Sequence, residues 1–217
     1  MRRVAVVLAV WAVAVGGALV MANALDSPVG QGARDEAQPA VPGPVASADG
    51  GLANLPPLAM VLDHSLPADI ADLAPIVQAQ RLRALAAKTS GPGRSVELGS
   101  VLQLLGDSAG AEAAYREALA RDPGSLGAQV GLALAAGATG SDGLIAAAAR
   151  MRELALANPR SQLVSFNQGW LEIYRRRGGP ARDAWKRTIA LGPRTRLGSI
   201  SASLLATLEK GSADRNP

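Results

Sequence analysis

Cysteine is absent from the 217 residues of this chain, and histidine occurs once. The lack of cysteine excludes a disulfide framework, a thiolate zinc site, a cysteine nucleophile and a lipid-modified N-terminal cysteine. The single histidine, His64 beside Asp63, has no second histidine and no spaced carboxylates with which to complete a metal site. We therefore expect no metal and no cofactor, and a His64 side chain that is solvated or caps a helix.

Aromatic side chains are also scarce, since the chain has six and four of them fall within one short stretch. These four are Phe166, Trp170, Tyr174 and Trp185. Most of any core must therefore consist of Leu, Val, Ile and Ala. A hydrophobic content of 48% with 18% charged residues nevertheless excludes a wholly disordered chain.

The net charge of +4 belongs to the C-terminal quarter of the chain. Residues 160–217 hold eleven basic and four acidic side chains, whereas residues 26–159 hold nine basic and fourteen acidic ones. Arginine outnumbers lysine by 19 to 3, a bias that GC-rich coding produces without selection for function. The basic character alone is thus no sign of nucleic-acid binding, and nucleic acid is not an expected partner.

The N-terminus has the pattern of a membrane-targeting segment. Residues 4–22 carry no charge and follow two arginines, and about 20 apolar residues match the thickness of a bilayer core. The arginines on the short flank place the N-terminus in the cytoplasm and the rest of the chain outside. The Ala-Asn-Ala at 22–24 matches a signal-peptidase site. Residues 1–25 are therefore expected to be an uncleaved signal anchor, or a signal peptide whose cleavage after Ala24 leaves a secreted protein. A buried helix of a cytosolic domain fits less well, because the run has no polar face.

Two further segments precede the repetitive part of the chain. Residues 26–57 are rich in proline and glycine and have few large apolar side chains, so they are expected to form a disordered linker. From Leu58 the composition changes. Residues 58–90 are expected to form a helical prelude of one or two short helices with a joint at Pro75.

Three units of helix, turn and helix follow, each ending at a proline. In the first unit, small residues stand where two helices must approach closely, a tyrosine fills the remaining volume and a proline ends the second helix. These residues are Gly99, Ala111, Tyr115, Ala118 and Pro123. Their spacing along residues 94–123 resembles that of the tetratricopeptide repeat family.

Pro159 and Pro193 continue the series at intervals of 36 and 34 residues, close to the family's period of about 34. In the third unit, Gly169, Ala181 and Trp185 keep the mutual offsets of the first. The resemblance implies an all-α fold, an α-α superhelix of about three repeats with a C-terminal capping helix. The expected segments are 91–125, 126–160 and 161–195 for the repeats, 196–210 for the capping helix and 211–217 for a disordered tail.

One sequence motif suggests catalysis and is outweighed by its context. Residues 106–110 (GDSAG) match the G-x-S-x-G motif of hydrolases, which needs a preceding strand and a later histidine. Here a helix is expected before the motif, and the only histidine comes earlier. We interpret the motif as a turn in which Asp107 or Ser108 caps the next helix. No phosphate loop, dinucleotide fingerprint or calcium loop is present. The chain is expected not to be an enzyme, and a hydrolase is the least favoured alternative.

The densest cluster of charge is basic and follows the aromatic stretch. Its members are Arg175, Arg176, Arg177, Arg182, Lys186 and Arg187. One interpretation is a helix C-terminus followed by a solvated helix face, where cations complement the helix dipole. The other is an electropositive patch for anionic lipid, an anionic envelope polymer or an acidic protein partner.

The resemblance also implies a binding groove, because family members hold extended or helical peptides against the first helices of their repeats. In the family's two-carboxylate mode, Lys, Asn and Arg project into that groove. That mode is not expected, because the corresponding stretches here offer Val96, Ser100 and Gln103, then Gln129, Leu132 and Ala136, then Leu163, Phe166 or Asn167, and Trp170. Occupation of the groove by the chain's own residues 58–88 is a further alternative.

Three aromatic residues are candidates for binding a partner in this groove. Phe166, Trp170 and Tyr174 are suited to anchoring an apolar or amphipathic segment, because aromatic side chains concentrate binding energy. The alternative is that they belong to the repeat core. The apolar stripe fits two helix registers that differ by two residues, so which aromatic rings face the core stays open.

These observations together predict a non-catalytic scaffold for protein interactions. We expect it to be tethered on the extracytoplasmic face of a bacterial-type membrane through its N-terminal helix, with a protein or peptide as partner. The alternative is an assembly factor of cytochrome c maturation or of another envelope complex, since some of these factors resemble this layout of an anchor followed by repeats.

Overall fold

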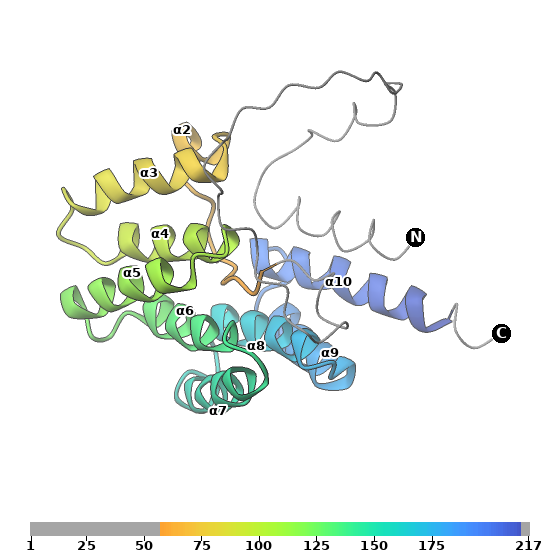
Figure 1. Cartoon of the computed structure of the whole chain (residues 1–217). Coiled ribbons are helices and arrows are strands. Elements are labelled where there is room, and N and C mark those ends of the chain that lie inside the picture. Colours follow the sequence, from red (N-terminus) through yellow and green to blue (C-terminus); the bar gives the residue numbers. More distant parts are fainter. Residues whose placement is uncertain (1–56, 214–217) are drawn as a thin grey trace, which may run out of the picture.

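The computed structural model of the protein describes residues 57–213, with side chains up to residue 209 (Figure 1). The predicted signal anchor or signal peptide, the linker up to residue 56 and residues 214–217 lie outside the described residues. None of the helices in the described part combines the length and the apolar character that a membrane span requires.

Residues 57–213 form helices and no strand, which confirms the all-α prediction. The helices are α2 (Ala68–Ala71), α3 (Pro75–Ala86), α4 (Gly93–Leu104), α5 (Ser108–Arg121), α6 (Leu126–Gly137), α7 (Ser141–Ala157), α8 (Gln162–Tyr174), α9 (Gly178–Leu191) and α10 (Arg196–Ala213). Within the span of the expected prelude, helix begins only at Ala68, and residues 57–67 are extended or bent. At the other end, α10 continues past residue 210, where the capping helix is expected to end.

The helices pack in neighbouring pairs, α4 with α5, α6 with α7 and α8 with α9 (Figure 1). Each pair also contacts the next one, because α5 packs on α6, α7 on α8 and α9 on α10. The first helices of successive pairs touch one another as well, so that α4, α6, α8 and α10 form one layer, here called the inner layer. This arrangement is consistent with an α-solenoid.

An aromatic wedge from the second helix of a pair fixes the approach of the helices. Tyr115 of α5 is fully buried against Gly99 of α4 and Gly131 of α6. A Cβ atom at position 99 would lie 2.5 Å from the tyrosine ring, and one at position 131 would lie 2.3 Å from it. No side chain fits at that distance, so the two glycines admit the ring that holds two repeats together.

Trp185 of α9 plays the corresponding part in the third pair. A Cβ atom at Gly169 of α8 would lie 2.5 Å from the indole Nε1, and that nitrogen donates a hydrogen bond to the Phe166 carbonyl at 3.2 Å. The indole and the ring of Phe166 are 6.4 Å apart between centroids. The buried indole thus packs its apolar surface against Phe166 and forms a hydrogen bond through its nitrogen.

The turns that end α4 and α8 have the same geometry. After α4, Gly106 donates to the Gln103 carbonyl at 3.0 Å and Asp107 donates to the Leu102 carbonyl at 2.9 Å. After α8, Arg176 and Arg177 repeat these two bonds at 2.9 Å and 2.8 Å. Such a pair of bonds requires a left-handed residue in its middle, which is Gly106 (φ +77°) in one turn and Arg176 (φ +58°) in the other.

Candidate functional site

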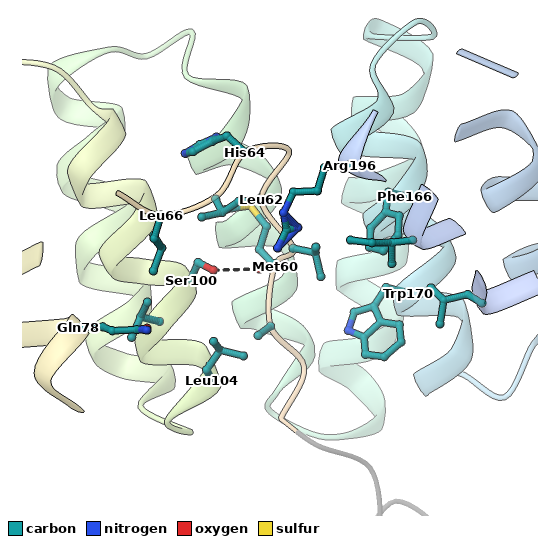
Figure 2. Close-up of a pocket in the computed structure, with 15 residues that line it drawn as sticks. Met60, Leu62, His64, Leu66, Gln78, Ser100, Leu104, Phe166, Trp170 and Arg196 are labelled. Carbon is teal, nitrogen blue, oxygen red and sulfur yellow. Dashed lines mark hydrogen bonds between the residues drawn. The ribbon is translucent and has the colours of Figure 1, made fainter. Parts of the chain in front are cut away.

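An extended segment of the chain lies against the inner layer, where a bound peptide would be expected. We call residues 58–66 the strap, and the surface of α4, α6 and α8 on which it lies the inner face. Figure 2 shows the strap running between α4 on one side and α8 on the other. Most of its apolar side chains are buried, with exposed fractions between 2% and 8% at Leu58, Ala59, Met60 and Leu62.

Side chains of two inner helices hold the strap by its backbone. The Met60 amide donates to Gln103 Oε1 at 3.0 Å. Ser100 Oγ donates to the Met60 carbonyl at 2.9 Å, as Figure 2 shows. The Val61 amide donates to Asn167 Oδ1 at 2.8 Å, and Asn167 Nδ2 donates to the Val61 carbonyl at 3.0 Å. Two successive residues of the strap thus have every backbone polar group bonded to the inner face.

The three polar side chains that hold the strap are themselves buried. Ser100, Gln103 and Asn167 are exposed by 5%, 3% and 0%. Ser100 and Gln103 stand three residues apart on α4, so both project from the same helix face. A buried polar group needs a hydrogen-bond partner, and in this structure the strap backbone supplies one to each of these three side chains.

Gln103 also links the strap to the repeat core. Its Oε1 accepts a second hydrogen bond, from the Tyr115 hydroxyl at 2.7 Å, and its Nε2 donates to the Gly131 carbonyl at 3.4 Å. Burial raises the pKa of Tyr115 well above its ordinary value, so the phenol stays a donor. The wedge that joins two repeats therefore also orients the amide that binds Met60.

The start of the strap packs on α6. A Cβ atom at Gly137 would lie 2.8 Å from Leu58 Cδ2, so the absence of a side chain at position 137 makes room for the leucine. The inner face thus has a space that fits the Leu58 side chain, in addition to the hydrogen bonds that it makes to the strap backbone.

The end of the strap makes polar contacts with α4. His64 Nδ1 lies 2.8 Å from Asp63 Oδ1, and His64 Nε2 lies 3.3 Å from Glu97 Oε1 on α4. Arg94 donates to the other oxygen of Glu97 at 2.7 Å. Burial lowers the pKa of Arg196 on α10, and the negative charge of Asp63 acts in the opposite direction. His64 thus connects the end of the strap to α4.

A hollow of about 680 Å³, part of it open to solvent, lies beside the strap. Its walls come from the strap, α3, α4, α8 and α10, and they include Leu66, Leu104, Phe166, Trp170 and Leu204 (Figure 2). One polar atom in this wall, Oε1 of Gln78, is buried and has no hydrogen-bond partner. The strap therefore leaves apolar surface of the inner layer within reach of a ligand.

The three aromatic groove candidates lie on α8 and are buried. Phe166 and Trp170 line the hollow beside the strap, with exposed fractions of 1% and 8%. Tyr174, exposed by 7%, packs edge-on against Trp170 with 5.8 Å between ring centroids and is not among the lining residues. Phe166 thus lines the hollow on one side and packs against Trp185 of the repeat core on the other. It has surroundings that fit a groove residue and surroundings that fit a core residue.

The basic cluster is partly neutralised by an acidic residue on α8. Arg175 Nη1 lies 2.8 Å from Glu172 Oε1, and Arg177 Nε lies 3.6 Å from Glu172 Oε2. Arg187 donates to the side chain of Gln168 at 3.0 Å. The remaining members, Arg176, Arg182 and Lys186, lie in the turn after α8 and on α9. The two outer cations of the Arg175–Arg177 run pair with Glu172, whereas the middle one, Arg176, forms the left-handed position of the turn.

The GDSAG motif forms a helix start. Asp107 is the N-cap of α5, and its carboxylate accepts a hydrogen bond from the Gly110 amide at 2.8 Å. The segment before it is α4, so the strand that a nucleophile elbow needs is replaced by a helix. Among the described residues, no group of three histidine or acidic side chains is placed to hold a metal ion.

The positions of the residues that hold the strap could be predicted from the sequence, but the function of their side chains could not. Ser100, Gln103 and Asn167 occupy the groove positions expected from the repeat pattern, but their type argues only against a carboxylate-binding mode. The available signal was polar side chains on helix faces that are otherwise apolar, because such groups need a bonding partner.

No family model and no curated protein sequence matches this chain.

Proposed function

We propose that the protein is a non-catalytic interaction scaffold of the tetratricopeptide type whose inner face binds an extended, apolar segment of a partner protein. The observation that carries this proposal is the strap. The inner face holds an extended backbone through Ser100, Gln103 and Asn167, and it surrounds that backbone with apolar side chains.

The bonding pattern supports peptide binding in preference to catalysis. Every hydrogen bond to Met60 and Val61 is made to a main-chain atom, so it would form with most residue types at those positions. Apolar contacts around Leu58, Met60 and Leu62 then select for the shape of the side chains. This division between main-chain affinity and side-chain selectivity is characteristic of peptide recognition.

Photo-crosslinking in intact cells tests this function. A photoreactive residue at Leu104, in the wall of the hollow, is compared with one at Glu112 on the outer helix α5. The proposal predicts a partner adduct from position 104 that is absent from position 112. Adducts from position 112 alone, or the same adducts from both, would contradict it.

The proposal extends to location. The uncharged run at residues 4–22 and the two arginines before it support a membrane anchor with the repeats on the extracytoplasmic side. Because the chain has no cysteine, a single cysteine at the exposed position Ser203 can be labelled selectively. A membrane-impermeant maleimide should label it in intact spheroplasts. Labelling only after lysis would place the repeats in the cytoplasm.

A further inference from the structure

We propose that the strap is an exchangeable internal ligand, and that the partner binds by displacing it with a segment of similar chemistry. This inference rests on the proposed function and adds to it a competition that limits partner binding. In this structure the inner face is occupied in cis, so a partner segment that uses Ser100, Gln103 and Asn167 must compete with residues 58–66.

The strap is held as a ligand is held. The partners of its main chain lie between 40 and 106 residues away along the chain, and none of the described strap residues belongs to a helix or strand. Its bonds join its own main chain to side chains of the inner helices. A second chain with the same backbone conformation would make the same bonds.

The strap can leave without separating any pair of repeat helices. It is followed by α2, a helix of four residues, and among the helices α2 packs only on α3. The wedges that join the repeats, Tyr115 and Trp185, come from α5 and α9 and contact glycines of the inner layer. One side of the strap faces the hollow, where Val61 is half-buried and His64 is exposed. A competing partner segment can therefore first contact this exposed side of the strap before it displaces the strap.

The strap defines the chemistry of the competing partner segment. Residues 58–62 are uncharged, with apolar side chains at 58, 60 and 62 and a small one at 59, and an acidic residue follows at 63. The partner segment is thus an extended stretch of about five uncharged residues, mostly apolar.

The covalent link makes the strap a strong competitor. A tethered segment has an effective concentration on the order of millimolar, so a free peptide of the same sequence binds the native chain with reduced apparent affinity. Weakening the strap in cis must therefore raise the affinity for the same sequence supplied in trans. Fixing the strap in place must abolish that binding.

Three forms of the full chain test the proposal with one probe, a fluorescent peptide with the sequence of residues 57–67. The opened form carries Met60→Asp and Leu62→Asp, which change the strap and leave the inner face intact. The locked form carries Leu58→Cys and Gly137→Cys, in a chain that has no other cysteine. These positions are adjacent, since a Cβ atom at 137 would lie 2.8 Å from Leu58 Cδ2. The control peptide carries the two aspartates of the opened form.

We expect the opened form to bind the probe at least ten times more tightly than the native chain, and the control peptide to bind neither. The oxidised locked form should not bind the probe, and reduction by dithiothreitol should restore native affinity. Equal affinity in the opened and native forms, or binding to the oxidised locked form, would overturn the proposal. So would an opened form that is unfolded by circular dichroism and regains no helix when the probe is added.

The same forms separate this inference from the scaffold function. Partner adducts from position 104 that persist in the oxidised locked form would overturn strap exchange and leave the scaffold function standing. Conversely, an opened form that binds the probe but yields no partner adduct in cells would support exchange and contradict the scaffold function.

Discussion

Asn167 of α8 makes both hydrogen bonds of the Val61 backbone, accepting from its amide at 2.8 Å and donating to its carbonyl at 3.0 Å. The two residues are 106 positions apart in the chain, and the asparagine is fully buried. This bond pair joins an extended segment near the start of the described structure to the third helix pair. It is the most specific link between the strap and the repeats.

Asn167→Ala is predicted to lower the free energy of unfolding by about 1–3 kcal/mol, because it removes the hydrogen-bond partner of both the amide and the carbonyl of Val61, which are partly buried. Urea denaturation measures the change. Gln168→Ala is the matched control, since it removes an amide one residue away that bonds only Arg187 at the surface. Equal losses in the two variants would mean that Asn167 does not hold the strap.

Gly131→Ala is predicted to destabilise the chain by about 1–3 kcal/mol through overpacking, because its Cβ atom would lie 2.3 Å from the Tyr115 ring. The control is Gly178→Ala at the start of α9, where a Cβ atom meets nothing within 4 Å. That change should be neutral or stabilising by up to about 1 kcal/mol. Thermal melting of both variants checks the prediction, which is wrong if Gly131→Ala melts no lower than the native chain.

Arg176→Gly is predicted to stabilise the chain by about 0.5–1 kcal/mol. Arg176 has a positive φ in a turn whose counterpart after α4 has Gly106 at this position. The left-handed conformation is strained for a residue with a Cβ atom and not for glycine. Arg176→Ala is the control, because it removes the same charge and keeps the Cβ atom. Chemical denaturation should give the Arg176→Gly variant a higher free energy of unfolding than both the native chain and the Arg176→Ala variant. If alanine gains as much as glycine, the charge is responsible and the backbone is not.

Alkaline pH is predicted to unfold the chain through its two tyrosines. Burial raises the pKa of both Tyr115 and Tyr174 above the value of an exposed tyrosine. The folded state therefore keeps protons that the unfolded state loses, so the free energy of unfolding is unaffected below about pH 10 and falls as the pH rises above it. Phenolate absorbance should appear together with the loss of helix. Ionisation of either tyrosine while the helix content stays constant would contradict this.

The helical architecture could be predicted because its signals are local and repeated. Prolines at regular intervals and small residues opposite Tyr115 and Trp185 indicate helix pairs, and the structure has helices and no strand in its described part. The contact of Tyr115 with a second glycine, Gly131, could not be predicted, since Gly131 lies in the next repeat at a position for which the repeat pattern requires no small residue.

The strap could be anticipated only as part of residues 58–88, one alternative occupant of the groove. An extended segment has no periodicity, and Leu58 to Leu62 read equally well as the beginning of a helix. Its conformation is decided by Ser100, Gln103 and Asn167, residues that lie 40 or more positions further along the chain. The roles of Phe166 and Trp170 depend on the same long-range contact, since the strap lies beside them in the hollow.

Hydrogen exchange of the native chain tests the central claim most directly. The unlabelled peptide of residues 57–67 is added in excess, and amide exchange is followed by mass spectrometry in the strap and in α4 and α8. The account predicts that the strap amides, including those of Met60 and Val61, lose protection while the amides of α4 and α8 keep theirs. Strap amides that stay as protected as those of the inner helices at saturating peptide would contradict it, because the strap would then be a fixed part of the core.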